Sequence, residues 1–174
     1  SFQVSLTPGE PLRPLAKVAS GGEAARLMLA LKGILSAADR VPTLIFDEID
    51  AGIGGRVGGV VGEKLWALTL GAEGAGADRQ RQAICVTHLP QVAAYGDAHF
   101  RVAKAVAEGR TRTAVNLLDS GGRVEELAQM LGASTAIARE NGLQLLQQAE
   151  QWKLGRAGGN AEGLGVANDP ARPR

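Results

Sequence analysis

The stretch Leu44-Ile45-Phe46-Asp47-Glu48 combines a short apolar run with two adjacent carboxylates. The run is typical of a strand that is buried on both faces of a parallel sheet. An acidic residue often simply ends a strand, but two neighbouring carboxylates repel each other and need a cation or a proton to offset their charge. A magnesium ion is the natural answer, with one carboxylate holding the metal and the other orienting an attacking water. The stretch therefore predicts phosphoryl-transfer chemistry.

A second apolar strand, 83–87, ends at His88. If the two apolar runs are neighbours in one sheet, His88 emerges at the same edge as Asp47 and Glu48, where ligands of open sheets bind. There the imidazole can sense or polarise a phosphate. A single histidine at a strand end is more often an ordinary surface or capping residue, so a functional role depends on this pairing.

The segment Ser20-Gly21-Gly22-Glu23 begins a predicted helix. In structural terms Ser-x-x-Glu is a capping box, in which the two side chains satisfy each other's backbone amides. The glycine pair adds no helix propensity, yet it leaves the amides of a helix N-terminus bare, where the helix dipole favours a phosphate. This segment is therefore a candidate anion site as well as a cap.

The rest of the chain alternates helices and strands, which predicts an α/β fold with a mostly parallel sheet and flanking helices. A glycine-rich loop through Gly55 and a flexible insert at 71–78 separate the first elements. The turn Glu108-Gly109 predicts a C-terminal antiparallel hairpin of strands 100–105 and 111–117. The predicted helices span residues 21–35, 56–70, 92–95, 123–131 and 135–154.

Length and composition predict one globular domain, because 174 residues with 45% hydrophobic content match the usual domain size of about 100–200 residues. We place this domain at residues 1–154. Residues 155–174 are rich in glycine and poor in apolar side chains, so they bury too little surface to offset the entropy of ordering. This segment is predicted to be a disordered tail.

The net charge of +1 excludes a global field that would draw the chain onto nucleic acid or an acidic membrane. Contact with DNA must then be local, and four basic residues on or near the predicted hairpin are candidates, although scattered charges usually form a solvated face: Arg101, Lys104, Arg110 and Arg112. The single Cys85 cannot form an internal disulfide, and the sequence shows no leader and no apolar run of membrane-spanning length. We expect a soluble, cytoplasmic protein without a membrane partner.

Together, and in this order, the three motifs resemble the ATP-binding-cassette family of ATPases. Ser20-Gly21-Gly22-Glu23 resembles the family's signature motif, Leu44–Glu48 resembles Walker B with its catalytic glutamate, and Asp50 resembles the D-loop aspartate. His88 resembles the switch histidine. Each motif alone is weak, whereas the ordered set is specific.

The resemblance implies a role for each of these residues. Asp47 would support magnesium, Glu48 would position the attacking water and His88 would contact the γ-phosphate of ATP. Ser20, Gly21, Gly22, Glu23 and Asp50 would act in trans, on ATP held by the opposite head of a dimer. ATP and Mg²⁺ are the cofactors that the family implies.

Within that family, the sequence most closely resembles the SMC-like RecN type of DNA-repair ATPase, over residues 2–152. The resembling stretches are 8–12, 17–23, 45–55 and 85–93. The resemblance implies two head halves separated by a coiled coil, action in DNA double-strand break repair and recombination, and association with the nucleoid after DNA damage. DNA and a second, ATP-dependent head are the implied partners.

The sequence departs from the family's pattern in one respect, because it contains no GxxxxGK[ST] P-loop and no Gly-Lys pair at all. In this family the P-loop lies in the N-terminal half of the head. The chain therefore resembles the C-terminal half of a split head, and we expect it to be inactive as an ATPase until the N-terminal half is supplied.

A non-enzymatic alternative is a module that serves only for dimerisation or for docking on DNA, through the four basic residues near the hairpin. Three enzymatic alternatives also compete with this interpretation. A Rossmann enzyme is excluded, because Val57 replaces the third glycine of G-x-G-x-x-G and nearby carboxylates would repel a pyrophosphate. Another ATP-binding-cassette system shares the motif order, although transporter ATPases typically carry aspartate directly after the switch histidine, where Leu89 stands here. A nucleotide-independent metal-dependent hydrolase would use five residues: Asp47, Glu48, Asp50, His88 and His99.

Overall fold

The computed structural model describes residues 3–5, 9, 11–14, 20–35, 41–70, 81–107 and 110–162. The predicted insert 71–78, the Glu108-Gly109 turn and residues 163–174 of the predicted tail lie outside these ranges. In chain order the elements are β1 (Gln3–Val4), β2 (Arg13–Pro14), α2 (Gly21–Ile34), β3 (Thr43–Phe46), α3 (Gly55–Thr69), β4 (Gln82–Cys85), α4 (Pro90–Ala93), β5 (Phe100–Ala107), β6 (Arg110–Leu117), α5 (Ser120–Met130) and α6 (Ala136–Glu162).

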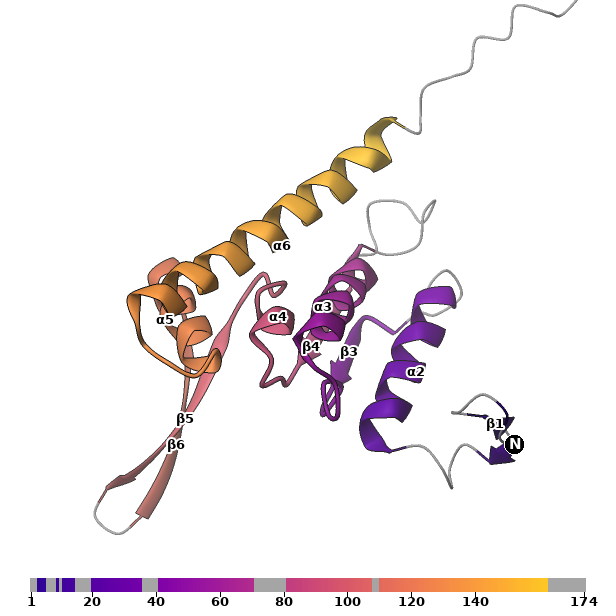
Figure 1. The fold of residues 1–174 in the computed structure, drawn as a ribbon, viewed down its shortest axis with the longest axis horizontal. Coiled ribbons are helices and arrows are strands. Elements are labelled where there is room, and N and C mark those ends of the chain that lie inside the picture. The colour runs from indigo at the N-terminus through magenta and orange to yellow at the C-terminus, as the bar shows by residue number, and fades with distance from the viewer. Residues whose placement is uncertain are drawn as a thin grey trace, which may run out of the picture.

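Strands β3 and β4 pair in parallel, with Thr43 opposite Gln82 and Phe46 opposite Cys85. Both strands therefore end at the same edge of the sheet, as the sequence predicts. β4 ends at Cys85, two residues before the predicted boundary, so the chain leaves the ladder before it reaches His88. Helices α2 and α3 lie beside this pair (Figure 1), and α3 contacts both α2 and β4.

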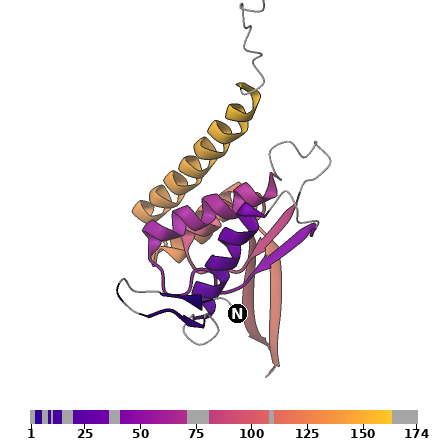
Figure 2. The same cartoon turned by 90° about the vertical axis from the view of Figure 1, so that its right-hand side faces the viewer.

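Within the described residues these strands are buried on one face only, whereas the sequence predicts burial on both faces. Leu44 and Phe46 point into the core, whereas the side chain between them, Ile45, is 71% exposed. Ile84 and Val86 are exposed as well. The side chains of a strand alternate between the two faces, and the helices of the described residues cover one face of this pair only. The view in Figure 2 shows this helical layer on one side of the two strands.

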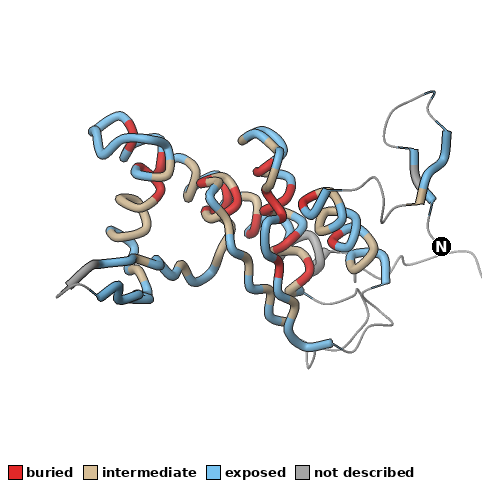
Figure 3. The backbone as a smooth tube through the Cα atoms, turned by 90° about the horizontal axis from the view of Figure 1, so that it is seen from below, coloured by how far each residue is buried: buried red, intermediate tan, exposed pale blue. Residues whose placement is uncertain are grey.

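The main core lies between α2, α3, α4 and the β3–β4 pair. Its buried members are Leu29, Phe46, Ile49, Val61, Leu65, Leu68 and Val92. Close packing here depends on small residues of α3, since a Cβ on Gly62 would stand 2.5 Å from the ring of Tyr95. The buried segments gather along the helices, while the β5–β6 hairpin runs outside them (Figure 3).

The C-terminal part confirms the predicted antiparallel hairpin and two helices, with different boundaries. β5 and β6 pair from Phe100 opposite Leu117 to Ala107 opposite Arg110. α5 begins at Ser120, three residues before its predicted start, because Asp119 caps it by accepting a hydrogen bond from the amide of Gly122. Together the hairpin, α5 and α6 complete the mixed α/β architecture that the sequence predicts.

Helix α6 continues to Glu162, eight residues beyond its predicted end at Leu154, and so runs into the segment predicted as the tail. The helix is anchored near that point, because Trp152 packs edge-on against Trp66 and Tyr95. Beside it, buried Lys153 donates a hydrogen bond of 2.7 Å to Asp97. The Trp152–Trp66 contact joins α6 to α3, and the Lys153–Asp97 hydrogen bond joins α6 to the segment before β5. Across the described ranges, none of the helices has the length and apolarity needed to cross a membrane.

Two glycines of α3 give a matched test of this packing. Gly62→Ala should lower the free energy of unfolding by about 1–3 kcal/mol, because the new methyl group overlaps the ring of Tyr95. Gly59→Ala is the control: a Cβ at Gly59 meets no atom within 4 Å, so alanine should raise stability by up to about 1 kcal/mol through helix propensity. Urea unfolding followed by circular dichroism measures both, and equal stability of the two variants would contradict this packing.

Candidate functional site

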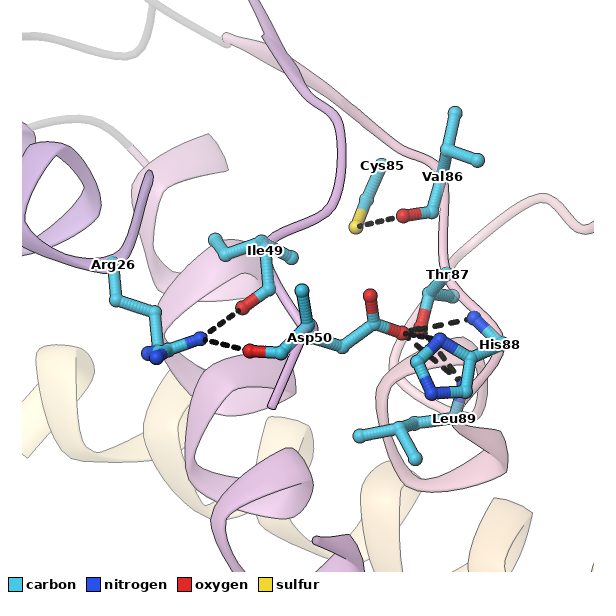
Figure 4. A network of polar contacts seen from close by, with 9 residues as sticks. Arg26, Ile49, Asp50, Cys85, Val86, Thr87, His88 and Leu89 are labelled. Atoms are coloured by element: carbon cyan, nitrogen blue, oxygen red, sulfur yellow. Dashed lines mark hydrogen bonds and ion pairs between the residues drawn. The ribbon is translucent and has the colours of Figure 1, made fainter. Parts of the chain in front are cut away.

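The predicted site residues come from three segments that the fold brings together: the start of α2, the loop after β3 and the loop after β4. Figure 4 shows these segments joined by a network of polar contacts. The parallel register of β3 and β4 places the segment 47–51 beside the segment 86–89. The amide of Val86 extends the ladder by donating a hydrogen bond to the carbonyl of Phe46, which fixes the two loops relative to each other.

Glu48 lies between these segments with an unusual backbone. Its φ angle is +55°, in the left-handed region that non-glycine residues rarely adopt. Such conformations cost on the order of 1–3 kcal/mol and persist where the surrounding structure enforces them. A Cβ on Gly21 would stand 3.4 Å from Oε2 of Glu48, so the exposed carboxylate points toward the N-terminus of α2.

The capping box predicted at the start of α2 is confirmed. Ser20 Oγ accepts a hydrogen bond of 3.3 Å from the amide of Glu23, and Glu23 Oε2 accepts one of 2.8 Å from the amide of Ser20. The hydrogen bonds from Ser20 lower the pKa of Glu23. The amides of Gly21 and Gly22 have no acceptor within an α-helix at these positions, so the cap and an anion site are compatible.

Close packing explains why residue 22 is a glycine, which the sequence alone did not indicate. A Cβ there would stand 2.7 Å from the carbonyl oxygen of Ala51, so only glycine allows α2 to approach the loop this closely. One helical turn later, Arg26 Nη1 donates hydrogen bonds of 3.0 and 2.9 Å to the carbonyl oxygens of Ile49 and Ala51. The start of α2 and the loop 49–51 therefore form one rigid unit.

Asp50 is the most buried polar side chain of this site, at 2% exposure. Its Oδ2 atom accepts hydrogen bonds from the Thr87 hydroxyl, from the amide of His88 at 2.8 Å and from the amide of Leu89 at 3.3 Å. Nδ1 of His88 lies 3.1 Å from the same oxygen. A single carboxylate oxygen thus organises the whole turn that follows β4.

The charge of Asp50 is maintained despite this burial. Burial alone raises the pKa of a carboxyl group, but the hydrogen bonds from Thr87 and from the His88 amide more than offset it, so the pKa of Asp50 is lowered. The His88 side chain remains 71% exposed. With Nδ1 held by Asp50, the imidazole keeps a fixed orientation and Nε2 is the ring nitrogen that a ligand can reach.

Asp47 and Glu48 meet the requirement for a magnesium ion in their donor chemistry. Both side chains are exposed at the end of β3, and carboxylate oxygens are the ligands that Mg²⁺ prefers in proteins. The described residues contain no group of three or more His, Cys, Asp or Glu side chains that could hold a metal ion by themselves. Magnesium bound here would therefore retain water or substrate oxygens, as it usually does.

The five-residue cluster of the metal-dependent hydrolase does not assemble. Asp50 is turned toward the turn after β4, and His99 lies before β5 near Arg123 and Glu126. Burial, followed by the positive charge of Arg123, lowers the pKa of His99. His99 is therefore part of the base of the hairpin rather than of the site.

The four basic residues proposed for DNA contact do not share one face of the hairpin. In the pairing of β5 with β6, Arg101, Arg112 and Arg110 fall on one face, and Lys104 falls on the other. Arg101 also lies 3.6 Å from Glu126, which partly neutralises it. Three of the four residues therefore share a face of the hairpin, and Lys104 stands apart from them.

Sequence reasoning missed two residues of the site, Arg26 and Thr87. Arg26 follows Gly22 by four positions, so both lie on the face of α2 that meets the loop 49–51. A positively charged side chain on the packed face of a helix needs an acceptor nearby, and this signal could have revealed the role of Arg26. Thr87 precedes His88 directly, and a hydroxyl at a strand end is a common hydrogen-bond donor to a buried carboxylate.

Comparisons with known proteins identify relatives of one kind. The DNA repair protein RecN of Xylella fastidiosa (strain Temecula1 / ATCC 700964) is 50% identical over 131 residues, covering 75% of this chain and 22% of the relative. RecN of Bacillus subtilis is 42% identical over 154 residues, covering 87% and 25%, and RecN of Treponema pallidum is 43% identical over 159 residues, covering 90% and 26%. The chain spans about a quarter of the length of the curated relatives it matches.

A scan of protein-family models finds no match. Among solved structures, one described as "Structural biochemistry of ATP-driven dimerization and DNA stimulated activation of SMC ATPases" aligns at 20% identity with a TM-score of 0.45. The alignment covers 72% of this chain and 69% of that chain.

Cys85 reports whether the site is closed. Burial, then the negative charges of Asp50 and Asp47, raises the pKa of its thiol to about 12. Because the thiolate is the nucleophile, iodoacetamide at pH 8.5 should alkylate the native chain roughly a thousandfold more slowly than the chain in urea, where the pKa returns to about 8.5. Mass spectrometry of quenched samples measures both rates. A native rate close to that in urea would mean that the loops 47–51 and 86–89 are open.

Proposed function

Because this chain has a RecN-type sequence over three quarters or more of its length, we propose that it is the C-terminal part of an SMC-like ATPase head. In this proposal the head binds ATP with magnesium and hydrolyses it, in the service of DNA double-strand break repair and recombination. A separate segment supplies the P-loop, which the 174 residues lack. The observation that carries the proposal is the parallel pairing of β3 with β4, which sets the loop with Glu48 and Asp50 beside the turn with His88.

The geometry supports a distinct role for each group. Asp47, exposed at the end of β3, would hold Mg²⁺ through its water shell. Glu48 would act as the general base that orients the attacking water, since its carboxylate is exposed and its backbone is fixed in an unusual conformation. His88 would offer Nε2 to the γ-phosphate, because Asp50 holds Nδ1.

The start of α2 would bind the γ-phosphate of ATP held by a second head. Ser20 and Glu23 complete the capping box, and the bare amides of Gly21 and Gly22 carry the positive end of the helix dipole. Gly21 is exposed, and the Glu48 carboxylate that points toward this helix end would have to turn away as a phosphate approaches, because the two negative charges repel each other. Such a site requires no side-chain cation, and it would close only when two heads come together around ATP.

The uncovered face of the β3–β4 pair supports completion by another segment. Three apolar side chains are exposed there: those of Ile45, Ile84 and Val86. Burial of each would stabilise the assembled protein by about 1.5–3 kcal/mol. A partner segment that carries the P-loop would cover this face and bring its phosphate-binding backbone beside Asp47. The segment would thus supply both the missing cover of the sheet and the missing part of the ATP site.

Reconstitution tests the split head. The chain alone should neither bind ATP tightly nor hydrolyse it, whereas co-expression with the N-terminal segment of the same protein should restore both, because the P-loop provides most of the phosphate contacts. Isothermal titration calorimetry and phosphate release measure the two activities. Micromolar ATP affinity of the chain alone would contradict a split head.

Glu48→Gln in the completed head tests the catalytic base. The amide keeps the shape of the side chain but cannot accept a proton, so turnover should fall about a hundredfold or more while ATP binding persists. Glu140→Gln is the matched control, because Glu140 is exposed on α6 away from the site. A Glu48→Gln head with turnover close to that of the control would assign the base to another residue.

A further inference from the structure

The polar contacts of the site form a continuous bridge from the start of α2 to His88. Arg26 joins α2 to the loop 49–51 through the carbonyl oxygens of Ile49 and Ala51. Asp50, in the middle of that loop, joins it to the turn 87–89. Figure 4 shows Arg26 and His88 at opposite ends of this bridge, with Asp50 between them.

The direction of Asp50 decides where it can act. Its side chain is 2% exposed, and Oδ2 is occupied by donors from Thr87, His88 and Leu89 of its own chain. To reach ATP on a second head, the carboxylate would have to break these hydrogen bonds and leave the interior. Breaking a buried network of this kind leaves several donors unsatisfied, which is costly.

We propose that Asp50 is a positioning residue for His88 of its own head, and that Arg26 fixes the loop carrying Asp50 to the signature helix α2. The proposal rests on the proposed ATPase function. It replaces the trans role for Asp50 that the family resemblance implies. His88 then serves the ATP held by its own head, while α2 serves the ATP of the opposite head.

The bridge has a functional consequence, because its two ends belong to different ATP sites of the head dimer. Gly22 leaves no gap between α2 and the loop, since a methyl group at this position would overlap Ala51. A shift of α2 on contact with the opposite nucleotide would therefore move the loop 49–51 and, through Asp50, the turn 87–89. In this way one head's contact with its partner's ATP would adjust the histidine that acts on its own.

A first experiment needs no ATPase activity. In the chain itself, Asp50→Ala should raise the hydrogen-exchange rate of the His88 amide by about tenfold or more, relative to core amides of α3, because its acceptor is lost. Exchange at the Leu89 amide should rise less, since this amide also donates a hydrogen bond of 3.0 Å to the Thr87 hydroxyl. Asp50→Asn should raise both rates less than Asp50→Ala, since its amide oxygen can still accept. Asp119→Ala, which removes the α5 cap, is the control and should leave these two amides unchanged.

Arg26→Ala tests the other end of the bridge in the same measurement. It should raise exchange at the His88 amide by a smaller factor than Asp50→Ala, because the loop is freed while the carboxylate remains. An unchanged exchange rate at His88 in both Asp50→Ala and Arg26→Ala would overturn the bridge, whatever the ATPase activity of the completed head proves to be.

A second experiment assigns Asp50 to its own or to the opposite site. In mixed completed heads, one head has a disabled P-loop, so only the ATP held by the other head can be hydrolysed. Asp50→Ala in the ATP-holding head should lower kcat about tenfold or more with KM little changed, and Asp50→Asn should restore part of the loss. Asp50→Ala in the head with the disabled P-loop should leave kcat within about twofold of the unmutated mixture.

The outcomes separate this proposal from the ATPase function on which it rests. Loss of activity when Asp50→Ala lies only in the P-loop-disabled head would establish the trans role and refute the positioning role. Equal activity in both arrangements would also refute it. An unmutated mixture that hydrolyses no ATP would sink the proposed function instead, and the exchange measurements would then decide the structural role of Asp50. Circular dichroism of each variant confirms that it is folded.

Discussion

The hydrogen bonds to one oxygen of Asp50 are the constraint on which the site depends. A carboxylate at 2% exposure is tolerated only when donors surround it, and here the donors are two backbone amides and a hydroxyl from the turn after β4. The need to satisfy this charge fixes the turn 87–89, and this turn then fixes His88. Exposure of the imidazole is then compatible with a defined orientation, which a surface histidine ordinarily lacks.

The same loop is fixed from its other side by backbone contacts. Arg26 places a guanidinium against two carbonyl oxygens that a tight loop cannot use internally, and Gly22 allows the helix to come close enough for this reach. The unusual φ of Glu48 lies directly before the loop. The Glu48 carbonyl oxygen also accepts a hydrogen bond of 3.0 Å from the amide of Ala51, so the loop holds this backbone conformation from both sides.

Local signals in the sequence predicted the elements that carry the site, since the capping box at Ser20, the two strands at 43–46 and 83–87, and the hairpin follow from short-range patterns. The sequence left the pairing of the two strands as a condition, and the structure shows it to be parallel. Burial was harder to predict, because an apolar run such as Leu44–Phe46 specifies a preference for burial but not what covers each face. The bridge from Arg26 to Asp50 joins residues over 20 positions apart, and no local pattern specifies such a contact. The end of α6 was missed because its glycines disfavour a helix, whereas the contacts of Trp152 and Lys153 outweigh that preference.

The uncovered face of β3 and β4 and the inward-turned side chain of Asp50 show that the polar and the apolar contacts of the site differ in completeness. The contacts that organise the loops are complete within the described residues, whereas the apolar cover of Ile45 and Ile84 is not. In the proposed divided head, the loops that carry Glu48 and His88 would therefore be arranged before a partner segment docks, because their geometry depends on internal polar contacts rather than on the missing cover. Docking would then add hydrophobic burial and a phosphate-binding backbone without having to rebuild the loops, which keeps the entropy cost of assembly low. The proposed divided head would in this way assemble around ATP without rearrangement of the loops that this chain contributes.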